Sequence, residues 1–190
     1  MEKTLEQMTE ELVKNGKVEL PYIIIPEYDE LKVLEKMFKR NQKSLLKDFQ
    51  SISSISNILK EHGLKPRIFN YGIQTCDGYV REFIPMNSKL IRYSVQGVGL
   101  GLIHDDFDLK FLITPTALWL HHIEVKNKEK GFGTFLMNII LDVMDELKNQ
   151  IACVPTDIKG TQTELLRIRQ FYSSFGFVKE RKIIYRYLPK

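Results

Sequence analysis

The chain has 190 residues, of which 43% are hydrophobic and 27% charged, a composition typical of one folded domain whose core needs no disulfide or metal. No apolar run approaches the roughly 18 residues of a membrane span, and the segment 1–16 lacks the apolar stretch of a secretory signal. Two cysteines without metal-ligand spacing favour a reduced, cytoplasmic compartment, and a net charge of +4 permits an anionic ligand.

The first third of the chain is predicted to be mainly helical. Apolar residues at helical spacing predict helices at 3–14, 28–41 and 45–63, and a β-rich stretch predicts a strand at 17–25. Pro21 makes that strand an edge strand or an interrupted one. We expect residues 1–16 to form an N-terminal helical extension and residues 17–190 to form a single domain.

The middle of the chain is rich in β-branched and aromatic residues punctuated by turn signals. The predicted strands lie at 67–75, 79–85, 89–103, 110–114 and 118–125. Asp105 to Asp108 are expected to form a turn rather than a metal site, although His104 precedes them. Gly97, Gly99 and Gly101 lie inside a strand pattern and predict a bulge or a close backbone approach. Sequential strands usually neighbour each other, so an antiparallel meander is expected.

The last third contains the most regular helix pattern of the chain, which begins beside Gly131 and Gly133. Its apolar positions are Phe132, Phe135, Leu136, Ile139, Ile140, Val143, Met144 and Leu147. A short buried strand, a helix that begins near Thr163 and ends by Gly176, and a final strand are predicted after it, the strands at 151–155 and 179–188. This order predicts a mixed α/β (α+β) fold with helices on the faces of the sheet.

The glycines before this helix indicate a binding site for an anion. A helix start presents unpaired N–H groups and a partial positive charge, and glycine lets the backbone approach a ligand closely. Lys126, Lys128 and Lys130 would add positive charge there. The spacing matches neither a Walker A loop nor a dinucleotide fingerprint. A plain helix start beside a solvated lysine loop is the alternative.

The segment "LHHIEVKNKEKGFGTFLMNIILDVM" resembles the acetyl-CoA-binding motif of the GCN5-related N-acetyltransferases (GNAT superfamily). Ile123 to Val125 match the end of the family's strand. Lys128 to Gly133 match its Gln/Arg-x-x-Gly-x-Gly/Ala loop, with lysine at the first position. Downstream, Tyr172, Gly176 and Phe177 resemble the family's Tyr-x-x-x-Gly-Phe, although Leu165 stands where an asparagine is frequent. The resemblance covers about residues 117–187.

The resemblance implies a GNAT-like, mostly antiparallel central sheet with helices on both faces. It also implies a strand that splays from its neighbour, so that free backbone groups hold the pantetheine arm of coenzyme A. The amide of Val125 would polarise the thioester carbonyl. The implied cofactor residues are Ile123, Glu124, Val125, Lys128, Glu129, Lys130, Gly131, Phe132, Gly133 and Thr134.

Two catalytic residues are expected. By resemblance Tyr172 is the general acid that protonates the leaving thiolate, and a tyrosine packed in the core is the alternative. His121 is the candidate base, and water is its rival. In a regular strand His121 shares a face with Trp119, Ile123 and Val125, and His122 and Glu124 point to the opposite face.

The predicted function is transfer of an acetyl group from acetyl-CoA to a primary amine of a small-molecule or protein acceptor, by direct attack. Two alternatives stay open: a catalytically silent GNAT fold that binds coenzyme A or a partner, and a GNAT toxin that acetylates aminoacyl-tRNA. No metal and no membrane are expected. Nucleic acid is expected only under the toxin alternative, and a homodimer is compatible with the sequence.

Overall fold

The computed structural model describes residues 28–75, 78–79, 95–126, 131–155, 162–181 and 183–190. The helices are α2 (Tyr28–Phe38), α3 (Gln42–Glu61), α4 (Phe132–Leu147) and α5 (Gln162–Ser174). The strands are β1 (Arg67–Thr75), β2 (Gly78–Tyr79), β3 (Val95–Ile103), β4 (Phe107–Ile113), β5 (Leu118–Val125), β6 (Ile151–Cys153), β7 (Val178–Lys179) and β8 (Tyr185–Tyr187). The helix expected at 3–14, the strand at 17–25 and the expected domain boundary lie outside the described residues.

The strands form one mixed sheet in the order β2-β1-β3-β4-β5-β6-β8-β7. Every described pair is antiparallel except β5 with β6. Strands β3, β4 and β5 make the predicted meander, and α4 is the crossover between the two parallel strands. The predicted fold class, a mixed and mostly antiparallel α+β sheet with helices, is confirmed.

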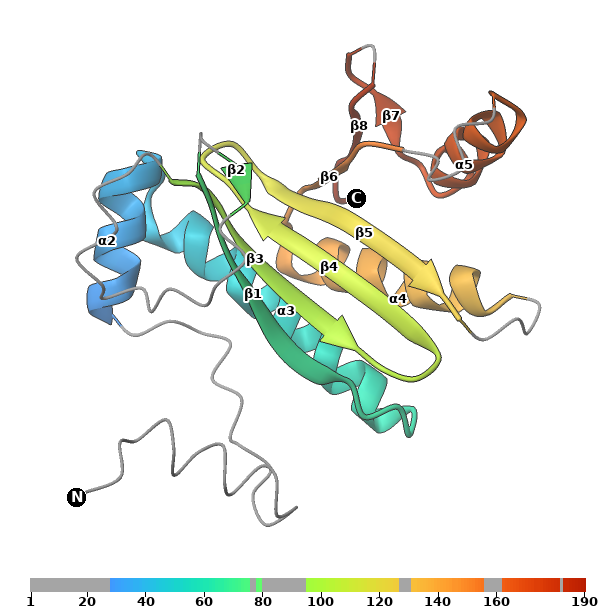
Figure 1. The fold of residues 1–190 in the computed structure, drawn as a ribbon, viewed down its shortest axis with the longest axis horizontal. Coiled ribbons are helices and arrows are strands. Elements are labelled where there is room, and N and C mark those ends of the chain that lie inside the picture. The colour runs from blue at the N-terminus through green and yellow to red at the C-terminus, as the bar shows by residue number, and fades with distance from the viewer. Residues whose placement is uncertain (1–27, 76–77, 80–94, 127–130, 156–161, 182) are drawn as a thin grey trace.

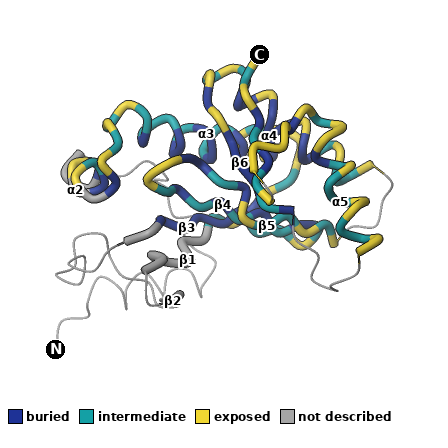
Figure 2. Tube along the Cα trace, turned by 90° about the horizontal axis from the view of Figure 1, so that it is seen from above, coloured by how far each residue is buried: buried dark blue, intermediate teal, exposed yellow. Residues whose placement is uncertain are grey.

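The hydrophobic core lies between this sheet and two long helices. Helices α3 and α4 pack against each other on one side of β3, β4 and β5 (Figures 1 and 2), whereas α5 lies beside β7 and β8 (Figure 1). In β4 the residues alternate between buried and partly exposed, as expected for a strand with one covered face. Its inward side chains are Phe107, Leu109, Phe111 and Ile113, all with zero exposure.

Several predicted boundaries are wrong for physical reasons that the structure shows. Strand β4 begins at Phe107, not at residue 110, because the preceding turn is tight: the N–H of His104 donates to the carbonyl of Phe107 at 2.9 Å. The predicted final strand is divided into β7 and β8 by a turn in which the Glu180 N–H donates to Ile184. Helix α2 ends at Phe38, before Lys39 takes a φ of 52°.

The part of the chain that the structure describes contains no helix long and apolar enough to cross a membrane. The close approach predicted for the glycines of β3 is confirmed at Gly97. A Cβ atom on this residue would lie 2.8 Å from Cδ1 of Leu112 on β4.

Candidate active site

Strands β5 and β6 form a fork. Strand β5 pairs with β4 from Leu118 to Val125, but its described pairing with β6 ends where Leu120 lies opposite Cys153. Beyond that point β5 continues to Val125, whereas β6 ends at Cys153. The resemblance to the GNAT superfamily implies a splayed strand at this place, and the splay stays a prediction.

The backbone of the last residues of β5 points into the fork. The N–H of Lys126 donates to the carbonyl of Asp106 at 2.8 Å, so it faces β4. Backbone groups alternate in direction along a strand. The N–H and C=O groups of Val125 and Ile123 therefore face away from β4, on the side where β6 has diverged. Their position suits the polarisation of a carbonyl held in the fork.

Helix α4 begins next to the end of β5 with its amides uncapped. Gly131 is the N-cap residue with a φ of 94°, it provides no side-chain cap, and the first turn has no acidic residue. Gly133 lies beside β5, since a Cβ there would be 3.5 Å from Cγ2 of Val125, an ordinary van der Waals contact. No side chain among the described residues caps this helix start, which is the kind of position where N–H groups can bind an anion.

The loop before this helix is described only in part. Lys128, Glu129 and Lys130 lie outside the described residues, so their predicted contacts with the cofactor stay predictions. Lys126 is described, and its Nζ donates to the carbonyl of His104 at 3.3 Å. It therefore holds the turn before β4 and is not only a solvated loop residue. The ring of Phe132 lies against those of Phe107 and Phe135, with centroids 6.2 and 5.8 Å away.

A β-bulge in β5 corrects the predicted orientation of its side chains. Leu120 lies opposite Phe111 and His122 lies opposite Lys110 on β4, so His121 is the extra residue of the bulge. An extra residue inverts the alternation of side chains. Ile123 and Val125 therefore face the core, while Trp119, before the bulge, lies opposite the partly exposed Leu112. The predicted common face of His121 with Trp119, Ile123 and Val125 is wrong.

His121 has the protonation state that a base requires. Desolvation lowers the pKa of its imidazole, and the nearby His122 and Lys110 lower the pKa further. A lowered pKa favours the neutral ring at pH 7, which can accept a proton. The bulge places this residue directly after Leu120, at the branch point of the fork.

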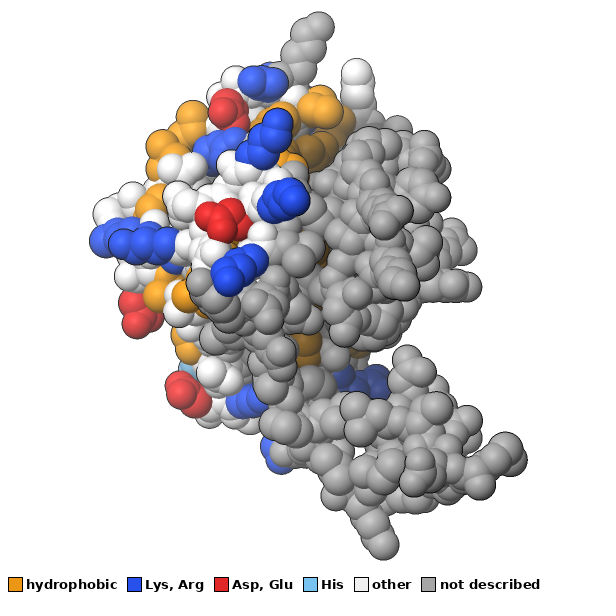
Figure 3. All heavy atoms as spheres, turned by 90° about the vertical axis from the view of Figure 1, so that its left-hand side faces the viewer, with side chains coloured by type: hydrophobic (Ala, Val, Ile, Leu, Met, Phe, Trp, Pro, Cys, Tyr) orange, Lys and Arg blue, Asp and Glu red, His pale blue; other side chains and the backbone are white. Residues whose placement is uncertain are grey.

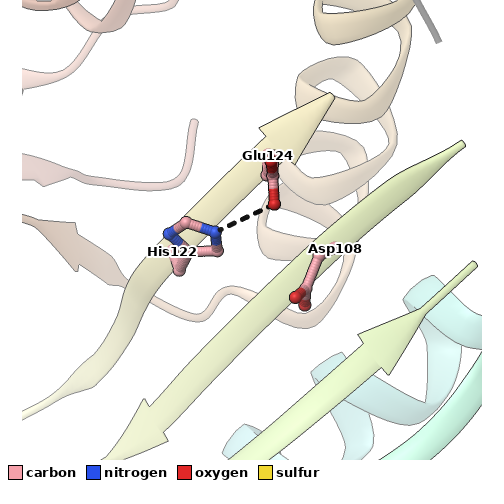
Figure 4. A group of neighbouring side chains, drawn as sticks. All are labelled: Asp108, His122 and Glu124. Carbon is pink, nitrogen blue, oxygen red and sulfur yellow. Dashed lines mark ion pairs between the residues drawn. The ribbon is translucent and has the colours of Figure 1, made fainter. Parts of the chain in front are cut away.

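A polar cluster on the outer face of β4 and β5 was not predicted. Asp108, His122 and Glu124 point toward one another from the two strands (Figure 4), and His122 Nε2 lies 3.8 Å from a Glu124 oxygen. Asp108 is paired with Lys110 at 3.4 Å. Sequence reasoning missed the cluster because it placed Asp108 in a turn. The one sequence signal for the cluster was the i, i+2 spacing of His122 and Glu124, which places both side chains on the same face of a strand.

The cluster consists of side chains of the types that coordinate divalent cations. One ligand atom from each of Asp108, His122 and Glu124 lies within 4.8 Å of the others. Positive charge is already present, since Lys110 pairs with Asp108 and lies opposite His122. The cluster thus places two carboxylates and an imidazole on the outer face of β4 and β5. It adds His122 and Glu124 to the groups that could receive a proton there.

Tyr172 is buried on α5 between aromatic rings. The ring centroids of Phe171 and Phe177 lie 5.7 and 5.3 Å from its own. Burial raises the pKa of its phenol, and the neighbouring Cys153 raises the pKa further. Because Cys153 is the residue of β6 at which the fork opens, Tyr172 lies beside that point. Its proton stays in place throughout the neutral range, so the hydroxyl can act as a donor and not as a base.

The Tyr-x-x-x-Gly-Phe sequence also has a structural role. Gly176 ends the helical segment with a φ of 87°, and the N–H of Phe177 donates back to the carbonyl of Tyr172 at 3.2 Å. Such a left-handed residue after a helix is a common C-terminal cap. The motif thus folds Phe177 against Tyr172. It explains why these residues occur together whether or not Tyr172 takes part in catalysis.

No family model matches this chain, and no curated protein matches it in sequence. The chain is similar in structure to the anti-CRISPR protein AcrVA5, with a TM-score of 0.37 and 21% sequence identity. That match covers 47% of this chain and 97% of the other. The fold described above rests on the strand order and pairing of this chain itself.

Proposed function

We propose that this chain is an N-acetyltransferase that uses acetyl-CoA to acetylate a primary amine. The observation that carries the proposal is the fork: the backbone groups of Ile123 and Val125, which face away from β4, lie near the start of α4, where no described side chain caps the helix. One end of such a site suits a thioester carbonyl and the other a pyrophosphate. Both ends lie within the sequence that resembles the GNAT motif.

Each step of the reaction has a candidate group in this chain. Acetyl-CoA supplies the thioester; the α4 amides hold its pyrophosphate, and the Val125 N–H stabilises the carbonyl oxygen as the amine attacks. The amine loses a proton to a base, for which neutral His121 is the first candidate. Water and the pair His122 and Glu124 are its rivals. As the C–N bond forms and the C–S bond breaks, Tyr172 gives its proton to sulfur.

The reference thiol pKa is about 8.5, well below that of a buried phenol. Proton transfer from Tyr172 to a free thiolate is therefore unfavourable by itself. It has to accompany C–S cleavage, when negative charge develops on sulfur beside the hydroxyl. The same burial favours the second candidate function, a catalytically silent module that binds coenzyme A and keeps Tyr172 as a core residue.

One assay separates these functions. Purified protein is incubated with acetyl-CoA and a panel of acceptors that includes polyamines, lysine peptides, small aromatic amines and charged transfer RNA, and free thiol is measured. Thiol release with an amine supports the enzyme, and release only with charged transfer RNA supports the toxin alternative. Binding of acetyl-CoA without release across the panel supports the silent module.

The site itself is tested by calorimetry with acetyl-CoA. Gly131→Glu places a carboxylate where the pyrophosphate should lie, and no described atom lies within 4 Å of the added Cβ. We expect at least a tenfold loss of affinity, or about 1.4 kcal/mol. Gly131→Ala is the matched control, because it shares the strain of a positive φ without adding charge. Equal affinities in the two variants would contradict the assignment.

A further inference from the structure

A cavity lies at the end of the molecule opposite the fork. Its volume is about 400 Å³, and it is enclosed by the start of α3, the connection from β4 to β5 and the end of α4. The 16 residues of α4 separate it from Gly131. At 1.5 Å per residue this is about 24 Å. The cavity is therefore distinct from the proposed acetyl-CoA site.

The charged residues that line this cavity are all cationic. They are Arg40, Lys43, Lys47 and Lys148, and no aspartate or glutamate is among the described lining residues. Figure 3 shows the face of the molecule that is on the left of Figure 1, where lysine and arginine side chains are interspersed with aspartate and glutamate side chains. Like charges repel, so such a group is stabilised by an anion.

One side of the cavity is held in place by a network of side-chain hydrogen bonds. The Arg40 guanidinium donates to the Asp48 carboxylate and to the Thr114 carbonyl, both at 2.8 Å. The fully buried Asp48 also accepts from the side-chain amide of Asn149 at 3.0 Å. These bonds fix Arg40 in place and balance its charge with that of Asp48. Lys148 has the Asp145 carboxylate as an anionic neighbour, so Lys43 and Lys47 are the excess charge of the cavity.

Two of the three lysines are held by hydrogen bonds at the edge of the cavity. Lys47 donates to the main-chain carbonyl of Lys148 at 3.2 Å, which is a neutral acceptor. Lys148 donates to a main-chain oxygen of Lys190 at 2.5 Å. Lys43 is exposed in the first turn of α3, which has no acidic residue, and the positive end of this helix adds to the field.

We propose that this cavity binds a small phosphorylated molecule of the nucleoside monophosphate type. The phosphate would lie among Lys43, Lys47 and Lys148, with the start of α3 beside it. Pro115 lines the same cavity and is exposed, so it offers an apolar contact for a ring, while Ala117 and Leu118 are buried beneath it. A concave site of this volume fits a small molecule and not the continuous backbone of a nucleic acid.

Calorimetry with adenosine monophosphate in the presence of saturating coenzyme A tests the proposal. We expect binding in the micromolar to millimolar range. It should weaken at least tenfold in Lys43→Glu and in Lys148→Glu. Lys36→Glu is the matched control, since Lys36 is an exposed lysine of α2 that does not line the cavity. Its affinity should stay within about twofold. Circular dichroism confirms that each variant is folded.

Titrations with parts of the nucleotide identify which part of the ligand the cavity recognises. Inorganic phosphate should bind more weakly than the nucleotide but with the same loss in Lys43→Glu, and adenosine should bind more weakly still. The proposal is overturned if the nucleotide does not bind at millimolar concentration, or if Lys43→Glu and Lys36→Glu have equal affinity. It is also overturned if Gly131→Glu abolishes binding, which would locate the nucleotide in the cofactor site. A single-stranded oligonucleotide that binds much more tightly than the monophosphate would replace the small molecule as the ligand.

Discussion

Tyr172 and His121 come from different elements, and the fork brings both to its branch point. Tyr172 lies beside Cys153, the last residue of β6, and His121 follows Leu120, the residue of β5 that pairs with it. The environment holds the phenol protonated and favours the neutral imidazole. Under the proposed function, Tyr172 would be the acid and His121 the base of acetyl transfer.

The role of Tyr172 is tested by removing only its hydroxyl. In Tyr172→Phe the ring contacts with Phe171 and Phe177 remain, so the Tm should change little. The Kd for acetyl-CoA should hold within a few-fold, and kcat should fall about 100-fold, the usual scale for a lost general acid. These values come from calorimetry and from thiol release with the best acceptor of the panel.

The matched control is Tyr187→Phe. Tyr187 is also buried, and its hydroxyl donates to the carboxylate of Asp145 at 2.9 Å. This variant should lose stability while keeping its turnover. If Tyr172→Phe turns over within about twofold of the parent when chemistry limits the rate, Tyr172 is a core residue only.

The base is identified by the pH dependence of kcat/KM. Because the pKa of His121 is lowered, the neutral base is fully present above the ordinary histidine value of about 6.5 and is lost only as the pH falls below it. We therefore expect an acid limb whose midpoint lies below that value and which is absent in His121→Ala. A limb that survives in His121→Ala and disappears in His122→Ala would assign the proton to the outer cluster instead.

At the scale of the elements, the agreement between sequence and structure follows from local periodicity. The bounds of β5 and of α4 match their predictions, because both carry uninterrupted strand or helix patterns. The bulge at His121 could not be predicted, since the extra residue is defined only by the register against β4. The cluster of Asp108, His122 and Glu124 depends on that same register. Nothing in the sequence of β5 alone distinguishes a bulged strand from a regular one.

One buried carboxylate adds a polar link to the hydrophobic contact between α3 and α4. Asp48 accepts from Arg40 and from Asn149, and so joins α3 to the end of α4 and to the β4–β5 connection that Arg40 also contacts. Asp48→Ala leaves Arg40 without its counter-charge, and breaking a buried ion pair in this way costs about 3–5 kcal/mol. Urea denaturation should show this loss in the free energy of unfolding.

Two further variants make that measurement specific. Asp142→Ala removes an exposed carboxylate of α4 and should change stability by no more than about 0.5 kcal/mol. Adding Arg40→Met to Asp48→Ala removes the unpaired charge and should recover part of the loss. If Asp48→Ala costs no more than Asp142→Ala, the ion pair contributes nothing to the packing of the two helices.

At the scale of the whole molecule, α4 connects the fork to the lysine-lined cavity. Its start lies at the fork beside Lys126, and its end contributes Lys148 to the cavity. The chain carries a net charge of +4, so its overall field favours anions at both ends. The two sites nevertheless differ in construction. The fork offers backbone amides, whereas the cavity offers lysine side chains around a fixed arginine.

This difference predicts how binding at the fork responds to salt. Between 50 and 500 mM salt the Debye length falls from about 14 Å to about 4 Å, which screens the attraction between the positive protein and the phosphates of coenzyme A. We expect the Kd for acetyl-CoA to rise severalfold over this range, as measured by calorimetry. Acetyl-pantetheine shares the thioester arm and lacks the phosphates, so its weaker binding should be nearly independent of salt. If both ligands respond equally, the phosphates do not bind near positive charge, and the helix start at Gly131 is not their site. If only acetyl-CoA responds, the phosphate end and the thioester end of the fork act separately, as its two kinds of backbone donor imply.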